Sequence, residues 1–242
     1  MREGVERVDG KKISLYIIMA KKKGRLMRIN HAGIAKANKA LAIAKQNKKM
    51  INKTIENKQD EYKNTNLSVS TSGVRDGAFC NIAQGATDEQ RIGNSVTLMK
   101  QQFDIFATQN PNGVIDDWNR MRVLIVESLD GSQPILLSDV LQYSSYSSDS
   151  DLVFSSPYTT KTSTNRRYRV HYDKTMELNR YGNGATRAMK FTKKWKKGKV
   201  LNFDDASQPP TNHQFSLLFI SDSDAVPHPL VNYSVRSTYK DA

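Results

Sequence analysis

The run Phe215-Ser216-Leu217-Leu218-Phe219-Ile220-Ser221 is the most apolar candidate strand in the chain. A short apolar run bounded by polar and turn-forming residues is typical of a β-strand. Turns such as Asn110-Pro111-Asn112-Gly113 separate further runs of this kind. These further candidate strands are residues 79–83, 96–108, 120–128, 152–154, 168–178, 188–195, 199–203 and 231–239. Short strands and polar turns therefore account for most of the chain beyond residue 67.

The order of these elements predicts an all-β fold. One short helix is expected at residues 135–141 and a serine-rich surface loop at residues 143–150. Strands do not alternate with long helices, which argues against a parallel α/β sheet. Several long connections argue against a simple meander. We therefore predict an eight-stranded antiparallel jelly-roll sandwich, with a bulge in the strand at 96–108, where the alternation slips near Gln101-Gln102.

Charge is concentrated in the first quarter of the chain. Residues 1–66 hold 17 Lys and Arg against 6 Asp and Glu, a net charge of +11, whereas residues 67–242 hold 20 against 18, a net charge of +2. Segregation of this kind indicates a polyanionic partner, and phosphate backbones are the commonest one. We therefore predict three parts: a disordered basic tail over 1–30, a basic arm helix and linker over 31–66, and a shell domain over 67–242.

The arm carries a helical stripe with a heptad-like period. Its members, spaced by three and four residues, are Ile34, Ala37, Leu41, Ala44, Lys48, Ile51, Ile55, Lys58 and Tyr62, and a polar linker follows from Asn64. Because alanine and lysine bury little apolar area, the helix is expected to be marginal alone. It is expected to self-associate through Ile34, Leu41, Ile51 and Ile55, or to form on nucleic acid; a solvated surface helix is the alternative.

Two groups of basic residues are the predicted nucleic-acid contacts. In the tail and arm these are Lys21, Lys22, Lys23, Arg25, Arg28, Lys36, Lys39, Lys45, Lys48, Lys49 and Lys53, of which the tail residues equally suit a nuclear import signal. In the shell domain they are Arg166, Arg167, Lys193, Lys194 and Lys196. Trp195 lies among the last group and suits stacking on a base. The alternative is a solvated strand end with Trp195 in the core.

Motifs for catalysis or for binding a cofactor are not evident. The single cysteine, Cys80, excludes an intrachain disulfide or a cysteine-based zinc site, and the four histidines are scattered. The paired acids, such as Asp204-Asp205, suit turns and caps, or Ca²⁺ between subunits. No apolar run is long enough to span a bilayer. We therefore predict a protein that is not an enzyme and has no membrane partner.

Three stretches resemble the coat protein of satellite tobacco necrosis virus and related small single-jelly-roll capsid proteins. The first is Met50-Ile51-Asn52-Lys53-Thr54-Ile55-Glu56-Asn57-Lys58, in the arm. The second is Ile82-Ala83-Gln84-Gly85 followed by Gln90-Arg91-Ile92-Gly93. The third is the ending Tyr233-Ser234-Val235-Arg236-Ser237-Thr238-Tyr239-Lys240-Asp241-Ala242. With the matching strand order, the resemblance covers residues 34–242.

The resemblance implies a subunit of a T=1 icosahedral shell of roughly sixty copies. It implies arm helices gathered at threefold axes and facing the packaged nucleic acid. It also implies Ca²⁺ between subunits, with Glu56 and Asp241 at positions that match ligands. The chain departs from the family where Ala86-Thr87 replaces paired aspartates.

We therefore predict a viral capsid protein that self-assembles and packages the viral genome, RNA or DNA, through its basic arm. The expected location is the virion, and the host cytoplasm or nucleus during assembly. The alternative is a cellular nucleic-acid-binding β-sandwich protein with a basic tail. A lectin-like jelly roll is a third reading, which makes no use of the arm.

Overall fold

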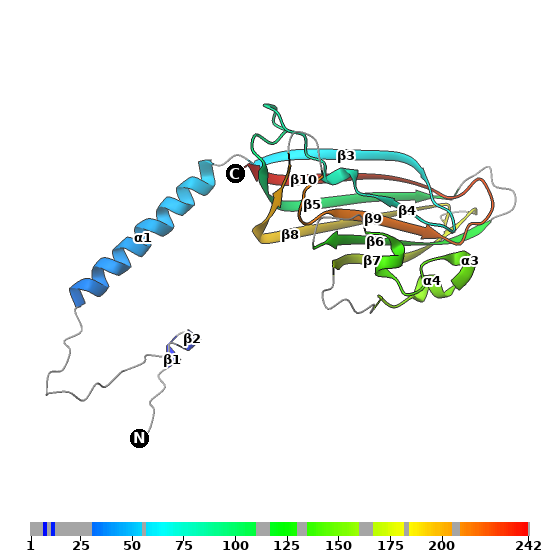
Figure 1. Ribbon diagram of the computed structural model, residues 1–242, viewed down its shortest axis with the longest axis horizontal. Helices are drawn as coiled ribbons and strands as arrows, with labels where there is room; N and C mark the ends of the chain where they lie inside the picture. Colours follow the sequence, from blue (N-terminus) through cyan, green and yellow to red (C-terminus); the bar gives the residue numbers. More distant parts are fainter. Residues whose placement is uncertain are drawn as a thin grey trace, which may run out of the picture. The chain divides into compact units, whose positions relative to one another are not determined.

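The computed structural model of the protein describes residues 7–8, 11–12, 31–54, 57–109, 117–129, 135–159, 167–181, 184–204 and 209–241. The chain divides into two compact units, Met1–Asn52 and Lys53–Ala242. The first unit holds helix α1 (His31–Thr54) and a small pair of strands, β1 (Arg7–Val8) and β2 (Lys11–Lys12). The second unit is a β-sandwich (Figure 1).

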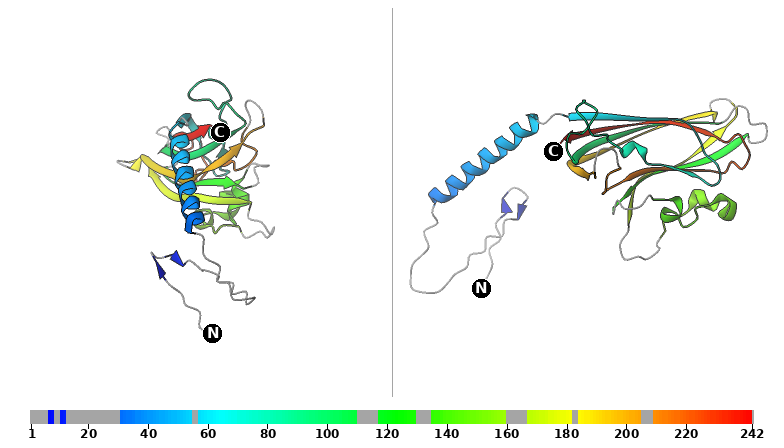
Figure 2. Two further views of the ribbon diagram at one scale, coloured as in Figure 1. Left: turned by 90° about the vertical axis from the view of Figure 1, so that its left-hand side faces the viewer. Right: turned by 45° about the horizontal axis from the view of Figure 1, so that its top comes forward.

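The sandwich has two four-stranded antiparallel sheets (Figure 2). Sheet A has the order β3-β10-β5-β8, and sheet B has the order β4-β9-β6-β7. The strands are β3 (Asn57–Ser68), β4 (Val74–Asp76), β5 (Ser95–Thr108), β6 (Trp118–Ser128), β7 (Tyr168–Asn179), β8 (Thr186–Asn202), β9 (Phe215–Ser221) and β10 (Leu230–Asp241). This double Greek-key order confirms the predicted jelly roll.

Strand β9 explains why the run at 215–221 is so apolar. Phe215, Leu217 and Phe219 pack in the core between the two sheets. Leu218 and Ile220 point to the other side, where they form a second core with Leu137. A strand that is buried on both faces needs apolar residues at consecutive positions, not at alternate ones.

Three short helices border the second core: α2 (Leu137–Val140), α3 (Tyr146–Asp149) and α4 (Leu152–Ser155). Arg122 of β6 holds this segment against sheet B. Its guanidinium makes a bidentate pair with Asp173, with Nε–Oδ1 at 2.9 Å and Nη2–Oδ2 at 2.7 Å. It also donates to the carbonyls of Val153 (2.6 Å) and Ser156 (3.1 Å). The predicted helix at 135–141 is thus present, and α3 lies within the predicted serine-rich loop.

Four sequence-based expectations are wrong. Residues 79–83 are not a strand, because Ala78–Cys80 form a 3₁₀ helix, and the expected strand at 152–154 lies in α4. The helical stripe does not continue to Tyr62, because α1 ends at Thr54 and Asn57–Ser68 form β3. The expected linker at 64–66 is therefore also strand. Alternation in β3, with Lys58 and Tyr62 more buried than their neighbours, matches pairing with β10.

The bulge predicted in β5 exists but lies nearer its start: in the pairing with β10, Met99 is the extra residue between Leu98 and Lys100. The two candidate strands at 188–195 and 199–203 are one strand, β8, with Gly198 at a φ of +75°. Pairing passes from Leu98–Lys199 to Lys100–Lys194, so four residues of β8 lie opposite Met99. Gly198 supplies the left-handed conformation that this bulge requires. None of the described helices has both the length and the apolar character needed to cross a membrane.

Candidate nucleic-acid interface

Helix α1 presents lysines to solvent. It is rich in alanine and lysine, which are strong helix formers. Lys36, Lys39 and Lys45 are exposed. Apolar side chains are exposed as well: Leu41 at 55%, Ile43 at 49% and Met50 at 53%. Within its own unit the helix therefore leaves apolar area uncovered, which agrees with the marginal helix expected from its sequence.

Several predicted site residues cannot be placed. Lys21, Lys22, Lys23, Arg25, Arg28, Ile55, Glu56 and Arg166 lie outside the described residues. Ile34, Lys48, Lys49, Ile51 and Lys53 belong to α1, but their side chains are outside the described part. Arg167 precedes β7 and is exposed, and its carbonyl accepts a hydrogen bond from the Leu129 backbone N–H at 2.8 Å.

The outer face of sheet A carries the other basic residues. Strand pairing places its outward side chains in four rows across the sheet. In order along the strands these are Gln59, Thr238, Lys100 and Lys194; Glu61, Arg236, Gln102 and Thr192; Lys63, Ser234, Asp104 and Lys190; and Asn232, Phe106 and Ala188. Five of these residues are Lys or Arg and two are acids. The predicted contact Lys194 therefore has Lys100 as its direct neighbour.

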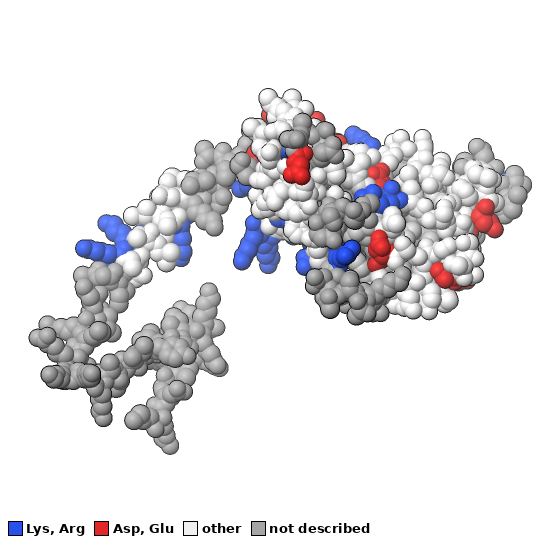
Figure 3. All heavy atoms as spheres, in the orientation of Figure 1, with Lys and Arg blue, Asp and Glu red and all other residues white. Residues whose placement is uncertain are grey.

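Both acids on this face already have basic partners. Glu61 lies 3.4 Å from Arg236 and 3.4 Å from Lys63. Asp104 lies 3.5 Å from Lys190. No described carboxylate lies within ion-pair distance of Lys100, Lys194 or Lys196. The outer face is therefore left with uncompensated positive charge beside β8; Figure 3 shows one view of the Lys and Arg side chains.

Of the two readings of Trp195, the structure favours the one that places it in the core. Trp195 is half-buried and packs against the core, with its ring 5.6 Å from Phe215 and 6.4 Å from His171. Lys193 is also half-buried. Like Phe191, it belongs to the side chains of β8 that point away from the outer face. Lys194 and Lys196 remain exposed. Alternation along β8 separates these lysines, which the sequence groups together.

A buried charge cluster joins the two sheets near β8. Glu127 of β6 is fully buried and accepts from His171 Nε2 at 2.6 Å; it also lies 2.9 Å from His213 Nδ1 and forms an ion pair with Lys199. Burial alone would raise the pKa of Glu127, but hydrogen bonds from His171 and Lys199 lower it from 4.5 to about 2. This cluster could not be predicted from the sequence, because its members are far apart along the chain.

Asp241, the predicted calcium ligand, is engaged within the chain. Its Oδ2 accepts from the Ile92 backbone N–H at 2.9 Å and lies 3.1 Å from Lys58 Nζ. Its Oδ1 is buried, and no described group hydrogen-bonds to it. Among the described residues no set of three His, Cys, Asp or Glu side chains is arranged to hold a metal ion. Asp241 therefore offers one free oxygen, and a calcium site there requires further ligands from Glu56 or from another copy.

The motif at 82–93 is structural in this chain. Gln84 and Arg91 form a β-bridge, and Arg91 is fully buried. Its guanidinium donates to the carbonyls of Ile82 at 3.1 Å and Gly93 at 2.6 Å and lies 4.4 Å from the centroid of the Phe203 ring. The motif thus closes the loop between β4 and β5.

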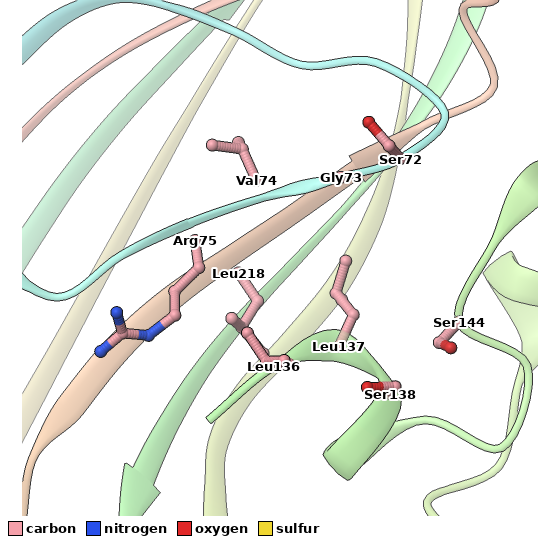
Figure 4. Close-up of a pocket in the computed structure, with 9 residues that line it drawn as sticks. All are labelled: Ser72, Gly73, Val74, Arg75, Leu136, Leu137, Ser138, Ser144 and Leu218. Atoms are coloured by element: carbon pink, nitrogen blue, oxygen red, sulfur yellow. The ribbon is translucent and has the colours of Figure 1, made fainter. Parts of the chain in front are cut away.

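A cavity of about 260 Å³ lies between β4 and α2 (Figure 4). Its apolar wall is formed by Val74, Leu136, Leu137 and Leu218, and Gly73, Arg75 and three serines complete the lining. Arg75 Nε donates to Ser216 Oγ at 3.2 Å. The lining residues include no acid, histidine or cysteine, so the cavity lacks the groups that acid–base or metal chemistry requires.

Comparison with known proteins finds low-scoring matches among solved structures. No protein-family model and no curated protein sequence matches the chain. Among solved structures it is similar to Desmodium yellow mottle tymovirus, with a TM-score of 0.37 and 8% identity over 77% of this chain and 88% of that one. It is also similar to empty heads of turnip yellow mosaic virus, with a TM-score of 0.33 and 6% identity over 78% and 82%. Turnip yellow mosaic virus itself matches with a TM-score of 0.31 and the same identity and coverage.

Proposed function

We propose that this chain is a viral capsid protein that self-assembles into a shell and packages the viral nucleic acid. One observation carries the proposal: a nearly neutral jelly-roll sandwich is joined to a separate unit with a strongly basic helix. Jelly rolls serve as capsid, lectin and cupin domains. Of these, a shell that encloses nucleic acid makes direct use of a basic arm, because the arm neutralises phosphate charge.

The exposed apolar side chains of α1 support self-assembly. Leu41, Ile43 and Met50 are each about half exposed, although burial would stabilise each of them by about 1.5–3 kcal/mol. Copies of α1 gathered at a symmetry axis would cover the stripe that holds Leu41, with Ile34, Ile51 and Ile55 completing the contact. Ile43 and Met50 follow Leu41 by two and nine residues, which places them on the opposite side of the helix. In this proposal the shell is a T=1 particle of roughly sixty copies.

The nucleic acid is the viral genome, either RNA or DNA, because phosphate contacts do not distinguish the two. Its contacts are the lysines and arginines of the tail and of α1, together with Lys194 and Lys196. The protein acts in the virion and, during assembly, in the host cytoplasm or nucleus.

Electron microscopy of the purified full-length chain, with and without added nucleic acid, tests this proposal. The expected result is closed particles of uniform size that contain nucleic acid, shown by a raised ratio of absorbance at 260 nm to that at 280 nm. A chain that stays monomeric at high concentration under both conditions would contradict the proposal. It would favour a cellular nucleic-acid-binding sandwich instead.

A further inference from the structure

We infer that the outer face of sheet A binds single-stranded nucleic acid, with Phe106 stacking on a base and Lys100, Lys194 and Lys196 contacting phosphates. The inference deepens the proposed function and rests on it in one respect, namely that nucleic acid is the partner. It adds a site on the sandwich that is separate from the arm, and it assigns the strandedness of the polymer.

Phe106 is the aromatic residue that makes this face different from a merely basic surface. Its side chain is 46% exposed, although β5 is paired with a neighbouring strand on both sides at this position. Its partners in the same row are Ala188 on β8 and Asn232 on β10. Because both neighbours are small or polar, the ring stands out from the sheet. An exposed aromatic ring flanked by short side chains is a stacking platform for an unpaired base.

The charge on the face matches a phosphate backbone. Lys100 and Lys194 are directly opposite each other across β5 and β8, so their positively charged side chains are direct neighbours on the outer face. Side chains of like charge in that position repel each other and destabilise the sheet unless an anion lies between them. The bulge in β8 adds the exposed Lys196 and Lys197 beside this pair. A polyanion would relieve this repulsion.

The spacing along the strands favours a polymer over a small anion. Phe106 and Lys100 are six residues apart on β5, which corresponds to about 20 Å along the strand. The rows between them carry polar side chains, such as Gln102 and Thr192, and the paired ions Asp104 and Lys190. A ligand that reaches both the ring and the lysine pair therefore spans several nucleotides.

The exposed ring of Phe106 and the lysine pair favour a single strand over a duplex or a second copy of the chain. In a duplex the bases are stacked on each other and are not available to Phe106. A second copy applied face to face would bring the two lysine pairs together, which like charge disfavours.

Fluorescence anisotropy of the full-length chain over a salt series tests the inference, with single-stranded RNA, single-stranded DNA and a duplex of equal length as probes. Phe106→Ala is expected to weaken binding of both single strands by about fivefold or more, with no change in salt slope. Duplex binding should not change. The double variant Lys100→Gln/Lys194→Gln is expected to lower the salt slope for single strands by about 1.4, because each lost phosphate contact removes about 0.7.

Matched controls lie on sheet B. Trp118→Ala removes an aromatic side chain that is 51% exposed, and Arg169→Gln/Lys174→Gln removes two exposed charges from β7. Both controls should bind all three probes as the parent chain does. Phe106→Ala and both controls should keep the parent melting temperature, and Lys100→Gln/Lys194→Gln should keep or raise it, because it removes the repulsion between the two lysines. The inference is overturned if Phe106→Ala binds single strands like the parent, if it loses duplex binding equally, or if Trp118→Ala shows the same loss.

Vesicles of anionic lipid test whether the outer face binds a membrane instead of nucleic acid. Phe106→Ala should bind them as the parent does, and a selective loss would assign the face to a membrane and overturn the inference. The outcome is distinct from that of the assembly test. If particles form and package nucleic acid normally, and Phe106→Ala does not change single-strand binding, this site is refuted but the capsid proposal is not. If the chain stays monomeric and its single-strand binding depends on Phe106, the capsid proposal is refuted and this site is supported.

Discussion

At the scale of single residues, two buried acids have opposite effects on the pH dependence of stability. Glu127 is held ionised by His171 and Lys199, which join β6 to β7 and β8. Asp60, on the core-facing side of β3, has the reverse environment. Burial, and then the charge of Glu89, raises its pKa from 3.8 to about 6. One acid therefore stabilises the fold when charged, and the other destabilises it.

Glu127→Gln should lower the free energy of unfolding by about 3 kcal/mol at neutral pH, because it leaves the Lys199 ammonium buried without its counter-charge. The folded-state pKa of Glu127 is about 2, below its ordinary 4.5. Its stabilisation is therefore complete above pH 4.5 and is lost as the pH falls towards 2. Urea unfolding of parent and variant across this range should show the difference shrinking with acid. Glu177→Gln, an exposed change on β7, is the control; an equal loss there would contradict the assignment.

Asp60→Asn should raise the melting temperature at about pH 8 and have little effect at about pH 3. Because the folded-state pKa is raised, the protonated acid is the favoured form in the folded protein. The stability it contributes is present below 3.8 and is lost as the pH rises through about 6. The amide cannot ionise, so it avoids this loss. Thermal melting at the two pH values measures the effect, with exposed Asp104→Asn as the control. Destabilisation at pH 8 would show that the charged form is favoured instead.

At the scale of elements, the junction between α1 and β3 determines where the arm can be removed. The helix ends at Thr54, and sheet pairing begins three residues later, with Asn57 opposite Lys240 of β10. Residues 57–63 therefore belong to the sandwich, although they continue the basic, polar composition of the arm. A truncation planned from composition would cut at residue 63 and remove half of an edge strand.

Deletion of residues 1–54 should leave the sandwich folded and strongly reduce co-purification of nucleic acid, because the arm lysines are lost and only the outer face of sheet A remains to bind it. Deletion of residues 1–63 should also lower the melting temperature by about 5 °C or more, since β10 loses pairing from Lys240 to Ser234. Thermal melting and the absorbance ratio at 260 and 280 nm measure the two effects. Equal melting temperatures would contradict the assignment of 57–63 to sheet A. Nucleic acid retained by the shorter deletion would point to the face that carries Phe106.

At the scale of the whole molecule, the sandwich is tied together by a core between sheets and by polar links across them. Tyr62 and Asn64 of β3 donate to Asp76 of β4, at 3.2 and 2.6 Å. At the other edge Glu127 and Lys199 make the equivalent link. A sandwich closed at both edges is a rigid building block, and assembly then depends on contacts between copies.

Calcium between subunits remains a prediction at this scale. Chelation should loosen assembled particles and lower their melting temperature, whereas the isolated subunit should be unaffected, because the described residues of one copy do not complete a site. Asp241→Asn or Glu56→Gln should remove the response to chelator. Glu61→Gln, an exposed acid on β3, is the control. Identical melting of particles with and without chelator would remove both acids from any metal site.

The sequence by itself determined the fold class and the division of charge. Runs such as residues 215–221 and 123–126 identify strands from the sequence alone, because a strand buried on both faces needs apolar residues at consecutive positions. Net charge is additive, so the basic arm is evident without coordinates. The prediction of a helix was wrong at residues 57–62, because this short segment fits two periods. Lys58 and Tyr62 belong both to the helical stripe and to the alternation of a strand.

Only the tertiary structure decided which side chains share a surface. Lys193, Lys194 and Trp195 are consecutive, yet alternation in β8 sends Lys194 outwards and Trp195 towards Phe215. Phe106 is apolar, yet it lies on the outer face, because Phe103, Ile105 and Ala107 occupy the inner one. The Glu127 cluster draws on three strands and a loop. Such groupings depend on pairing between distant segments, which residue order along the chain does not encode locally.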